Sequence, residues 1–205
     1  MEAFEADLDY ASLHPGYKIS EIPLNFGMVR YRRNLLPGGT FFFTLTVTDR
    51  RSSVLVDHID PLRRAFRTAR RERPFGIDAI VVLPDHLHMI MTLPPDDADF
   101  SGRWRRIKSL FTRLVVSRGF ECKRDRRGEY ALWQKRFWEH TVRDDRDFER
   151  HVDYIHYNPV KHGLASQVSD WPHSSFHRYV RLGVLPRDWA GVVVGKNARL
   201  GERTG

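Results

Sequence analysis

Two histidines separated by one residue are the first candidates for chemistry in this sequence. His86 and His88 lie in an apolar segment, with Leu87, Met89 and Met91 as neighbours. If this segment is a β-strand, both imidazoles point to one face and the apolar residues point to the other. Imidazoles on a buried strand are costly without a partner, and a shared metal ion would supply one. The alternative is one surface histidine and one hydrogen-bonded core histidine, but the apolar flanks favour a metal pair.

A tyrosine outside the apolar stripe of a predicted helix is the second candidate. Asp144 and Asp145 are expected to open this helix, which should end by Gly163. At helical spacing, the apolar stripe consists of Phe148, Val152, Ile155 and Pro159. Tyr154 instead falls on a polar face, together with Asp147, Arg150, Asn158 and Lys161. A tyrosine surrounded by such groups is placed to meet a phosphate rather than a core.

Tyr154 and Asn158 are four residues apart, so their side chains share one side of the predicted helix. This spacing would let the phenol approach a phosphate while the amide oxygen coordinates the same metal. Each residue has a plainer interpretation. Tyr154 can be an amphipathic surface aromatic, and Asn158, which precedes a proline, can cap a new turn begun by Pro159.

Further polar residues are weaker candidates. Glu139 and His140 lie in an aromatic segment and could assist proton transfer or orient a ligand, although a structural hydrogen-bonding role is the more frequent one. Arg150 and Lys161 could bind the phosphate groups of a polyanionic partner. The same is expected of Arg30, Arg32 and Arg33, unless these form only a solvated basic arm. Three tryptophans, 104, 133 and 138, are better assigned to core packing than to base stacking.

The elements that must position these residues follow an alternating order. Strands are predicted over residues 40–48, 75–83, 86–93 and 132–142. Helices are predicted over residues 60–73, 100–118 and 144–163. Strand–helix–strand–strand–helix–strand is the order of an α+β, ferredoxin-like (RRM-like) fold, an antiparallel sheet with two helices on one face. The last helix, which bears Tyr154, is then expected on the other face, where the site would lie.

Composition narrows the class of partner. The chain of 205 residues carries a formal net charge of +8, and all but six of its 34 basic residues are arginine, which suits phosphate binding. Cys122 is the sole cysteine, so a thiolate zinc cluster is excluded. Without a long apolar run or a secretion signal, the protein is expected in the cytoplasm, associated with the nucleoid and not with a membrane. The acidic residues 1–27 are predicted to be a loosely ordered flank, residues 28–190 the domain, and residues 191–205 a tail.

Four motifs resemble those of a known family. The stretches PGGTFFFT, VVLPDHLHMIMTLP, WQKRFWEHTVRDD and HVDYIHYNPVKHG occur in this order. They closely resemble REP-associated tyrosine transposases, relatives of the single-tyrosine transposases in the superfamily of HUH (histidine–hydrophobic–histidine) endonucleases. The resemblance covers residues 28–190. It implies that His86, His88 and Asn158 are metal ligands, that Tyr154 is the nucleophile, and that the substrate is a single-stranded DNA hairpin from repeated extragenic palindromes. Relatives include intertwined dimers in which the tyrosine helix reaches the partner's metal site, but this subgroup is expected to act as a monomer.

The expected reaction follows from the negative charge of a phosphodiester, which repels a nucleophile unless a cation offsets it. A divalent ion held by two neutral imidazoles and an amide would polarise the scissile phosphate, and Mg²⁺ or Mn²⁺ suits an oxygen-rich substrate. Attack by the phenol would give a 5′-phosphotyrosine and a free 3′-OH, so that strands are rejoined without ATP. Two rivals remain: a metal-dependent nuclease or phosphatase in which water attacks, and a non-catalytic nucleic-acid-binding module. The strands lack the aromatic RNP signature that the second rival would need.

Overall fold

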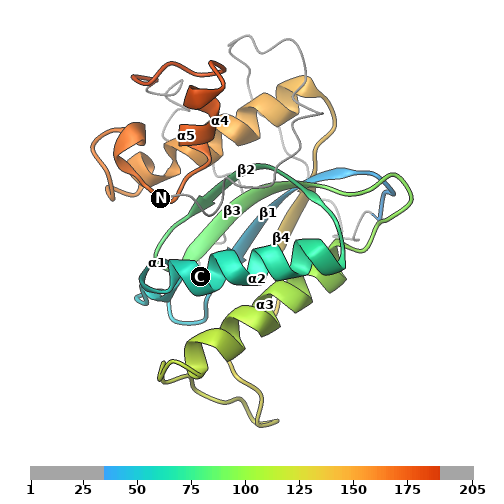
Figure 1. Ribbon diagram of the computed structural model, residues 1–205, viewed down its shortest axis with the longest axis vertical. Coiled ribbons are helices and arrows are strands. Elements are labelled where there is room, and N and C mark those ends of the chain that lie inside the picture. The colour runs from blue at the N-terminus through green and yellow to red at the C-terminus, as the bar shows by residue number, and fades with distance from the viewer. Residues whose placement is uncertain (1–34, 190–205) are drawn as a thin grey trace, which may run out of the picture.

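The computed structural model describes residues 35–189, and these form a four-stranded sheet with helices on both faces (Figure 1). The strands are β1 (Thr40–Thr46), β2 (Gly76–Val82), β3 (His86–Thr92) and β4 (Trp138–Thr141). The α-helices are α1 (Val54–Asp57), α2 (Ile59–Glu72), α3 (Phe100–Val116), α4 (Asp145–Lys161) and α5 (Phe176–Arg181), with a 3₁₀ turn η1 (Val168–Asp170) before α5. The expectations for residues 1–27, for Arg30, Arg32 and Arg33, and for the tail at 191–205 lie outside the described residues.

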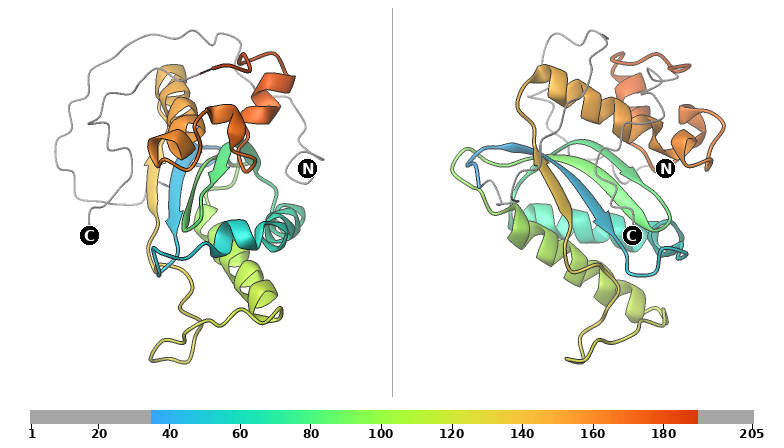
Figure 2. Two further views of the ribbon diagram at one scale, coloured as in Figure 1. Left: turned by 90° about the vertical axis from the view of Figure 1, so that its left-hand side faces the viewer. Right: turned by 180° about the vertical axis from the view of Figure 1, so that it is seen from behind.

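The sheet has the strand order β2-β3-β1-β4, and all three pairings are antiparallel. α2 and α3 cover one face, while α4 and α5 lie over the other, as Figure 2 shows from the side. This arrangement confirms the predicted ferredoxin-like fold, with the tyrosine helix on the face that the two crossover helices leave free. No helix in the described part of the chain is long and apolar enough to cross a membrane.

Alternating strand residues build a separate apolar core on each side of the sheet. Phe41, Phe43 and Leu45 of β1 pack toward α2 and α3, where Trp104 and other apolar side chains are fully buried. Phe42 points the other way, into the core beneath α4. Both faces of the sheet are therefore covered, which explains why the central strands read as nearly continuous apolar runs.

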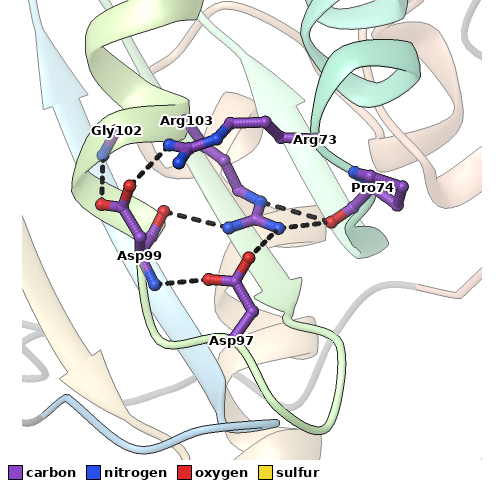
Figure 3. A network of polar contacts seen from close by, with 6 residues as sticks. All are labelled: Arg73, Pro74, Asp97, Asp99, Gly102 and Arg103. Carbon is purple, nitrogen blue, oxygen red and sulfur yellow. Dashed lines mark hydrogen bonds and ion pairs between the residues drawn. The ribbon is translucent and has the colours of Figure 1, made fainter.

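A buried arginine joins the two crossover helices. Arg103 is 1% exposed and donates hydrogen bonds to the carbonyl oxygens of Pro74 and Asp99 and to the Asp97 carboxylate, at 2.7–3.3 Å (Figure 3). Asp99 caps α3 by accepting a hydrogen bond from the Gly102 amide at 2.7 Å. These bonds satisfy the guanidinium and fix the start of α3 against the segment that follows α2.

The predicted last strand is much shorter than expected. β4 covers only Trp138–Thr141, whereas the prediction was 132–142. The preceding residues run beside the end of β1 in irregular pairing, through a bridge between Val47 and Trp133 and a hydrogen bond from Gln134 N to Thr46 O of 2.9 Å. An exposed stretch with Lys135 and Arg136 interrupts the apolar alternation there, so a regular strand forms only after it.

Residues 164–189, for which no element was predicted, close the free edge of β2. Val82 N donates to His173 O at 2.9 Å, and Ser175 N donates to Ile80 O at 2.8 Å. The indole of Trp171 donates to Val82 O at 2.9 Å. The backbone groups of β2 are thus satisfied at an edge that would otherwise be open to another strand.

Candidate metal and tyrosine site

The two histidines of β3 point to the same face of the sheet, beneath α4. Their ring centroids are 5.0 Å apart. Nδ1 of His86 donates a hydrogen bond to Asp85 Oδ1 at 2.7 Å, and Nδ1 of His88 is hydrogen-bonded to Thr44 Oγ1 at 2.8 Å. Each imidazole is therefore oriented through Nδ1, which leaves Nε2 as the nitrogen for a metal. Nε2 of His88 is buried and has no hydrogen-bond partner among the described residues.

The surroundings keep His88 neutral. Its complete burial, followed by the charges of His86, His162, Lys161 and Arg50, lowers its pKa well below the ordinary value. A neutral imidazole is the form that binds a metal.

The surroundings keep the Asp85 carboxylate, which lies beside His86, in its ionised form. Burial raises its pKa, but the hydrogen bond from His86 and the charges of His86 and Arg50 outweigh this and lower it. The Arg50 guanidinium lies 2.7 Å from Asp85 Oδ2. An ionised Asp85 therefore accepts from both neighbours.

α4 places Tyr154 directly against His88. The two ring centroids are 5.0 Å apart, and the tyrosine also contacts Phe42, at 5.9 Å. Tyr154 is only 3% exposed, so the polar face on which it was predicted is not a solvent face. This face packs on the sheet, and Nζ of Lys161 lies 5.0 Å from the centre of the phenol ring.

Asn158 is completely buried one turn beyond Tyr154, and neither atom of its amide has a hydrogen-bond partner in the described part of the chain. The alternative that Asn158 caps a new turn is excluded, because α4 continues through Pro159 to Lys161 and the Asn158 carbonyl accepts from His162 N at 3.0 Å. A buried amide without a partner is costly. Two imidazole nitrogens and an amide oxygen are suitable donors for a divalent cation, and Tyr154 lies beside His88.

A second cluster of possible ligands, His140, Asp147 and His151, lies further along α4, with ligand atoms within 4.8 Å of one another. His151 Nδ1 donates to the Asp147 carbonyl at 2.7 Å, so this nitrogen carries a hydrogen. The Asp147 carboxylate accepts from His140 Nε2 at 2.7 Å and from Arg143 N and Arg150 at 3.1 Å. These hydrogen bonds join α4 to β4, and Nε2 of His151 is buried without a hydrogen-bond partner among the described residues. Sequence reasoning missed it, although the spacing of Asp147 and His151 by four residues is a usable signal.

Comparison with known proteins decides the family. The family model described as "Transposase IS200 like" matches residues 42–158. A REP-associated tyrosine transposase of Escherichia coli is 49% identical over 176 residues, which cover 86% of this chain and 98% of the relative. The chain belongs to the REP-associated tyrosine transposases.

Two further comparisons give the same family. A Haemophilus influenzae relative, provisionally assigned to the same class, is 45% identical over 80% of this chain and 94% of its own length. The solved structure of a REP-associated tyrosine transposase bound to a REP hairpin is 49% identical, with a TM-score of 0.75, and covers 86% of this chain and 99% of that chain. Membership in this family means that the protein is a transposase, an enzyme that processes DNA.

The transposase fold separates the two residues that were predicted to assist. His140 lies opposite Phe42 in the pairing of β4 with β1, on the side of α4. Glu139 lies opposite Phe43 and therefore on the other side, toward α2 and α3. The structure brings His140, but not Glu139, to the face that carries His86 and His88.

A basic pocket adjoins the histidine pair of the transposase. It has a volume of about 400 Å³, and its lining includes Arg50, Arg51, His86 and His162. The rings of His86 and His162 are 5.3 Å apart. The sequence analysis did not select Arg50, Arg51 or His162, because only the turn between β1 and α1 and the end of α4 bring them to His86.

Proposed function

We propose that this transposase cleaves single-stranded DNA at palindromic hairpins through a covalent bond between Tyr154 and a DNA 5′-phosphate, with His86, His88 and Asn158 holding a divalent metal. The observation that supports it most is the set of buried donors without partners, Nε2 of His88 and the amide of Asn158, beside the Tyr154 ring. Buried polar atoms usually have a partner, and these unpaired atoms lie next to the proposed nucleophile.

The proposed reaction has balanced steps. The oxygen of Tyr154 attacks the phosphorus, the bond from phosphorus to O3′ breaks, and the phenolic proton ends on the released 3′-OH. A divalent ion, Mg²⁺ or Mn²⁺, supplies Lewis-acid polarisation of the phosphate when bound. The 5′-phosphotyrosine keeps the energy of the diester, so a 3′-OH can attack it and rejoin strands.

Basic residues around Tyr154 are proposed to hold the DNA backbone. Lys161 is exposed and lies against the phenol ring, where its ammonium can bind an oxygen of the scissile phosphate. Arg50 and Arg51 line the pocket beside His86 and can receive the next phosphate. Arg150 is bound to Asp147, so we assign it mainly to positioning α4. The roles of Arg30, Arg32 and Arg33 in DNA binding remain predictions.

The proposed partner is a DNA hairpin of the repeated extragenic palindromes, because the structural relative was solved with a REP hairpin. We propose that the enzyme acts as a monomer on DNA of the nucleoid, in the cytoplasm. Tyr154 lies against His88 of the same chain, so the proposed centre does not require a second copy.

The decisive test is a denaturing gel with labelled hairpin DNA, Mg²⁺ or Mn²⁺, and three proteins: wild type, Tyr154→Phe and Tyr157→Phe. We expect a metal-dependent, protease-sensitive adduct with wild type and with Tyr157→Phe, and none with Tyr154→Phe. The Tyr157→Phe variant is the matched control, since it removes a phenol from the same helix. Cleavage that persists in Tyr154→Phe would assign the attack to water, and hairpin binding that is indifferent to chelator, without any cleavage, would favour a simple binding protein.

A further inference from the structure

The long connection from α3 to β4 carries a group of exposed cations. We call residues 123–136 the basic loop. It carries six basic residues against two acidic ones, Asp125 and Glu129. The cations are Lys123, Arg124, Arg126, Arg127, Lys135 and Arg136, and all six are exposed.

The tip of the basic loop is a hydrogen-bonded turn. Asp125 Oδ1 accepts from the amides of Arg127 at 2.8 Å and Glu129 at 3.2 Å, and Gly128 at the turn has a φ of +77°. Asp125 therefore organises the backbone, and Arg126 and Arg127 form no salt bridge with any described residue. The turn presents two guanidinium groups to solvent on a fixed scaffold.

The basic loop lies at the same end of the sheet as the basic pocket. Thr48 N donates to Leu132 O at 2.8 Å, so the loop runs beside the segment that continues into Arg50 and Arg51. Hydrogen bonds from Arg51, and then the charges of Arg51 and Lys123, lower the pKa of Asp49, which places Lys123 near that segment. In Figure 1 the loop extends beyond α3 at the lower edge of the molecule, far from α4.

The chemistry of the loop fits a duplex better than a single strand. Proteins hold single strands largely by stacking bases on exposed aromatic rings, whereas a duplex backbone is bound by cations. Tyr130 is the exposed aromatic residue of the basic loop, and the Arg124 guanidinium lies 4.1 Å from the centre of its ring and donates to its hydroxyl at 2.9 Å. One face of the ring is therefore occupied by a cation.

From this geometry we infer that the basic loop is the docking surface for the double-stranded stem of the DNA hairpin, while the single-stranded flank enters the pocket at Arg50 and His86. The inference rests on the proposed function, because it assigns a second contact to the same substrate. The loop contributes affinity for the backbone of the stem and no sequence reading. It selects a folded hairpin over an unfolded strand.

The test compares two double variants of the full-length protein. Arg126→Ser/Arg127→Ser removes two charges from the loop tip, and Arg71→Ser/Arg105→Ser removes two exposed charges at the opposite end of the sheet. Fluorescence anisotropy is measured with a DNA hairpin that has a single-stranded 5′ flank, and with an unfolded strand of the same composition. We expect the loop variant to bind the hairpin about tenfold more weakly near 0.1 M salt, and the salt slope of its log affinity to fall by about 0.9 for each phosphate that the loop no longer neutralises.

Affinity for the unfolded strand is expected to stay unchanged in both variants. Equal hairpin affinity in the loop variant and wild type, or an equal loss in the control variant, would overturn the inference. Adduct formation on a short unfolded strand that contains the cleavage site separates the two proposals. If no protein forms an adduct but hairpin binding still depends on the loop, the covalent mechanism fails and the docking surface stands.

Discussion

The two histidines of the proposed metal centre differ in what holds them. His86 is held by an ionised carboxylate that is itself paired with Arg50, whereas His88 is held by the hydroxyl of Thr44. A carboxylate partner makes an imidazole a stronger electron donor than a hydroxyl partner does, and it also fixes the tautomer. We therefore expect Asp85 to raise the metal affinity of the proposed centre as a positioning residue that does not touch the metal.

Replacing Asp85 by Asn tests this role. We expect Asp85→Asn to bind Mn²⁺ about 10- to 100-fold more weakly in calorimetry, because its amide no longer enforces the tautomer of His86. Asp60→Asn is a suitable control, since Asp60 is exposed on α2. Asp85→Asn should unfold at a lower temperature than wild type because it also loses its ion pair with Arg50, so circular dichroism must confirm that both variants are folded at the temperature of the titration. Unchanged Mn²⁺ affinity in Asp85→Asn would refute the role of the carboxylate.

His156 predicts a pH dependence of stability. It is fully buried against Phe176 and Tyr179, and burial, followed by the charges of Arg178 and His177, lowers its pKa from 6.5 to about 3. The unfolded chain therefore binds a proton that the folded protein excludes. Stability is complete above pH 6.5 and is lost as the pH falls toward 3, by up to about 1.4 kcal/mol per pH unit from this group.

Urea unfolding of wild type and His156→Gln between pH 7 and pH 5 measures this contribution. The variant is less stable at neutral pH but should show a shallower decline with acid, by up to one proton. Parallel stability curves for the two proteins would contradict the burial of a neutral imidazole. His177→Gln, which alters a partly buried histidine nearby, serves as the comparison.

At the scale of elements, the long helices could be predicted from their helical period, and the central strands from their apolar, β-branched and aromatic composition. The tyrosine helix shows the limit of that reasoning. Its apolar stripe was read correctly, since Val152 and Ile155 are buried, but Tyr154 and Asn158 were placed on a polar face without knowing that this face is buried too. A periodic pattern reports apolar contacts and cannot show that polar side chains meet other polar side chains of a sheet.

Short or irregular elements escaped prediction for a different reason. α1 and η1 contain too few residues to display a period. Residues 164–189 contact the backbone of β2 through their own backbone and through the side chains of Trp171, Ser175, Arg178 and Tyr179, which follow no period. Adjacent strand residues always point to opposite faces, but only the register shows that His140, and not Glu139, faces α4.

The side chain of Ser175 helps to hold residues 173–175 against the edge of β2. Ser175 Oγ accepts from Ile80 N at 2.9 Å and is hydrogen-bonded to His156 Nε2 at 3.0 Å. Ser175→Ala leaves two buried polar groups without a partner, so we expect a loss of about 1–3 kcal/mol in unfolding free energy. Faster hydrogen exchange at the Ile80 amide would locate the effect, while Ser109→Ala, an exposed site on α3, should change neither quantity.

At the scale of the whole molecule, the described residues offer little surface for self-association. One edge of the sheet is covered by residues 173–175, and the other edge strand, β4, has only four residues. Among the described residues the exposed large apolar side chains are scattered: Leu35, Leu36, Tyr130, Leu164 and Leu182. Stable dimers usually bury a continuous apolar patch.

We therefore expect a monomer, and light scattering coupled to size-exclusion chromatography at micromolar concentration measures it directly. A mass near 24.1 kDa would agree with this prediction. A mass twice as large, independent of dilution, would contradict it and would point to contacts outside the described residues.

The short distance between Tyr154 and His88 within one chain has a consequence for stoichiometry. A centre with a single nucleophile holds one DNA end at a time, yet excising a segment requires two cuts. One molecule must release the first DNA end from Tyr154 before it can make the second cut, or two molecules must bind the same DNA. The rate of cutting should therefore be first order in enzyme concentration, whereas the rate of excision by two molecules should rise with its square. In that second case, a low concentration of the protein would itself limit how often a DNA segment is excised.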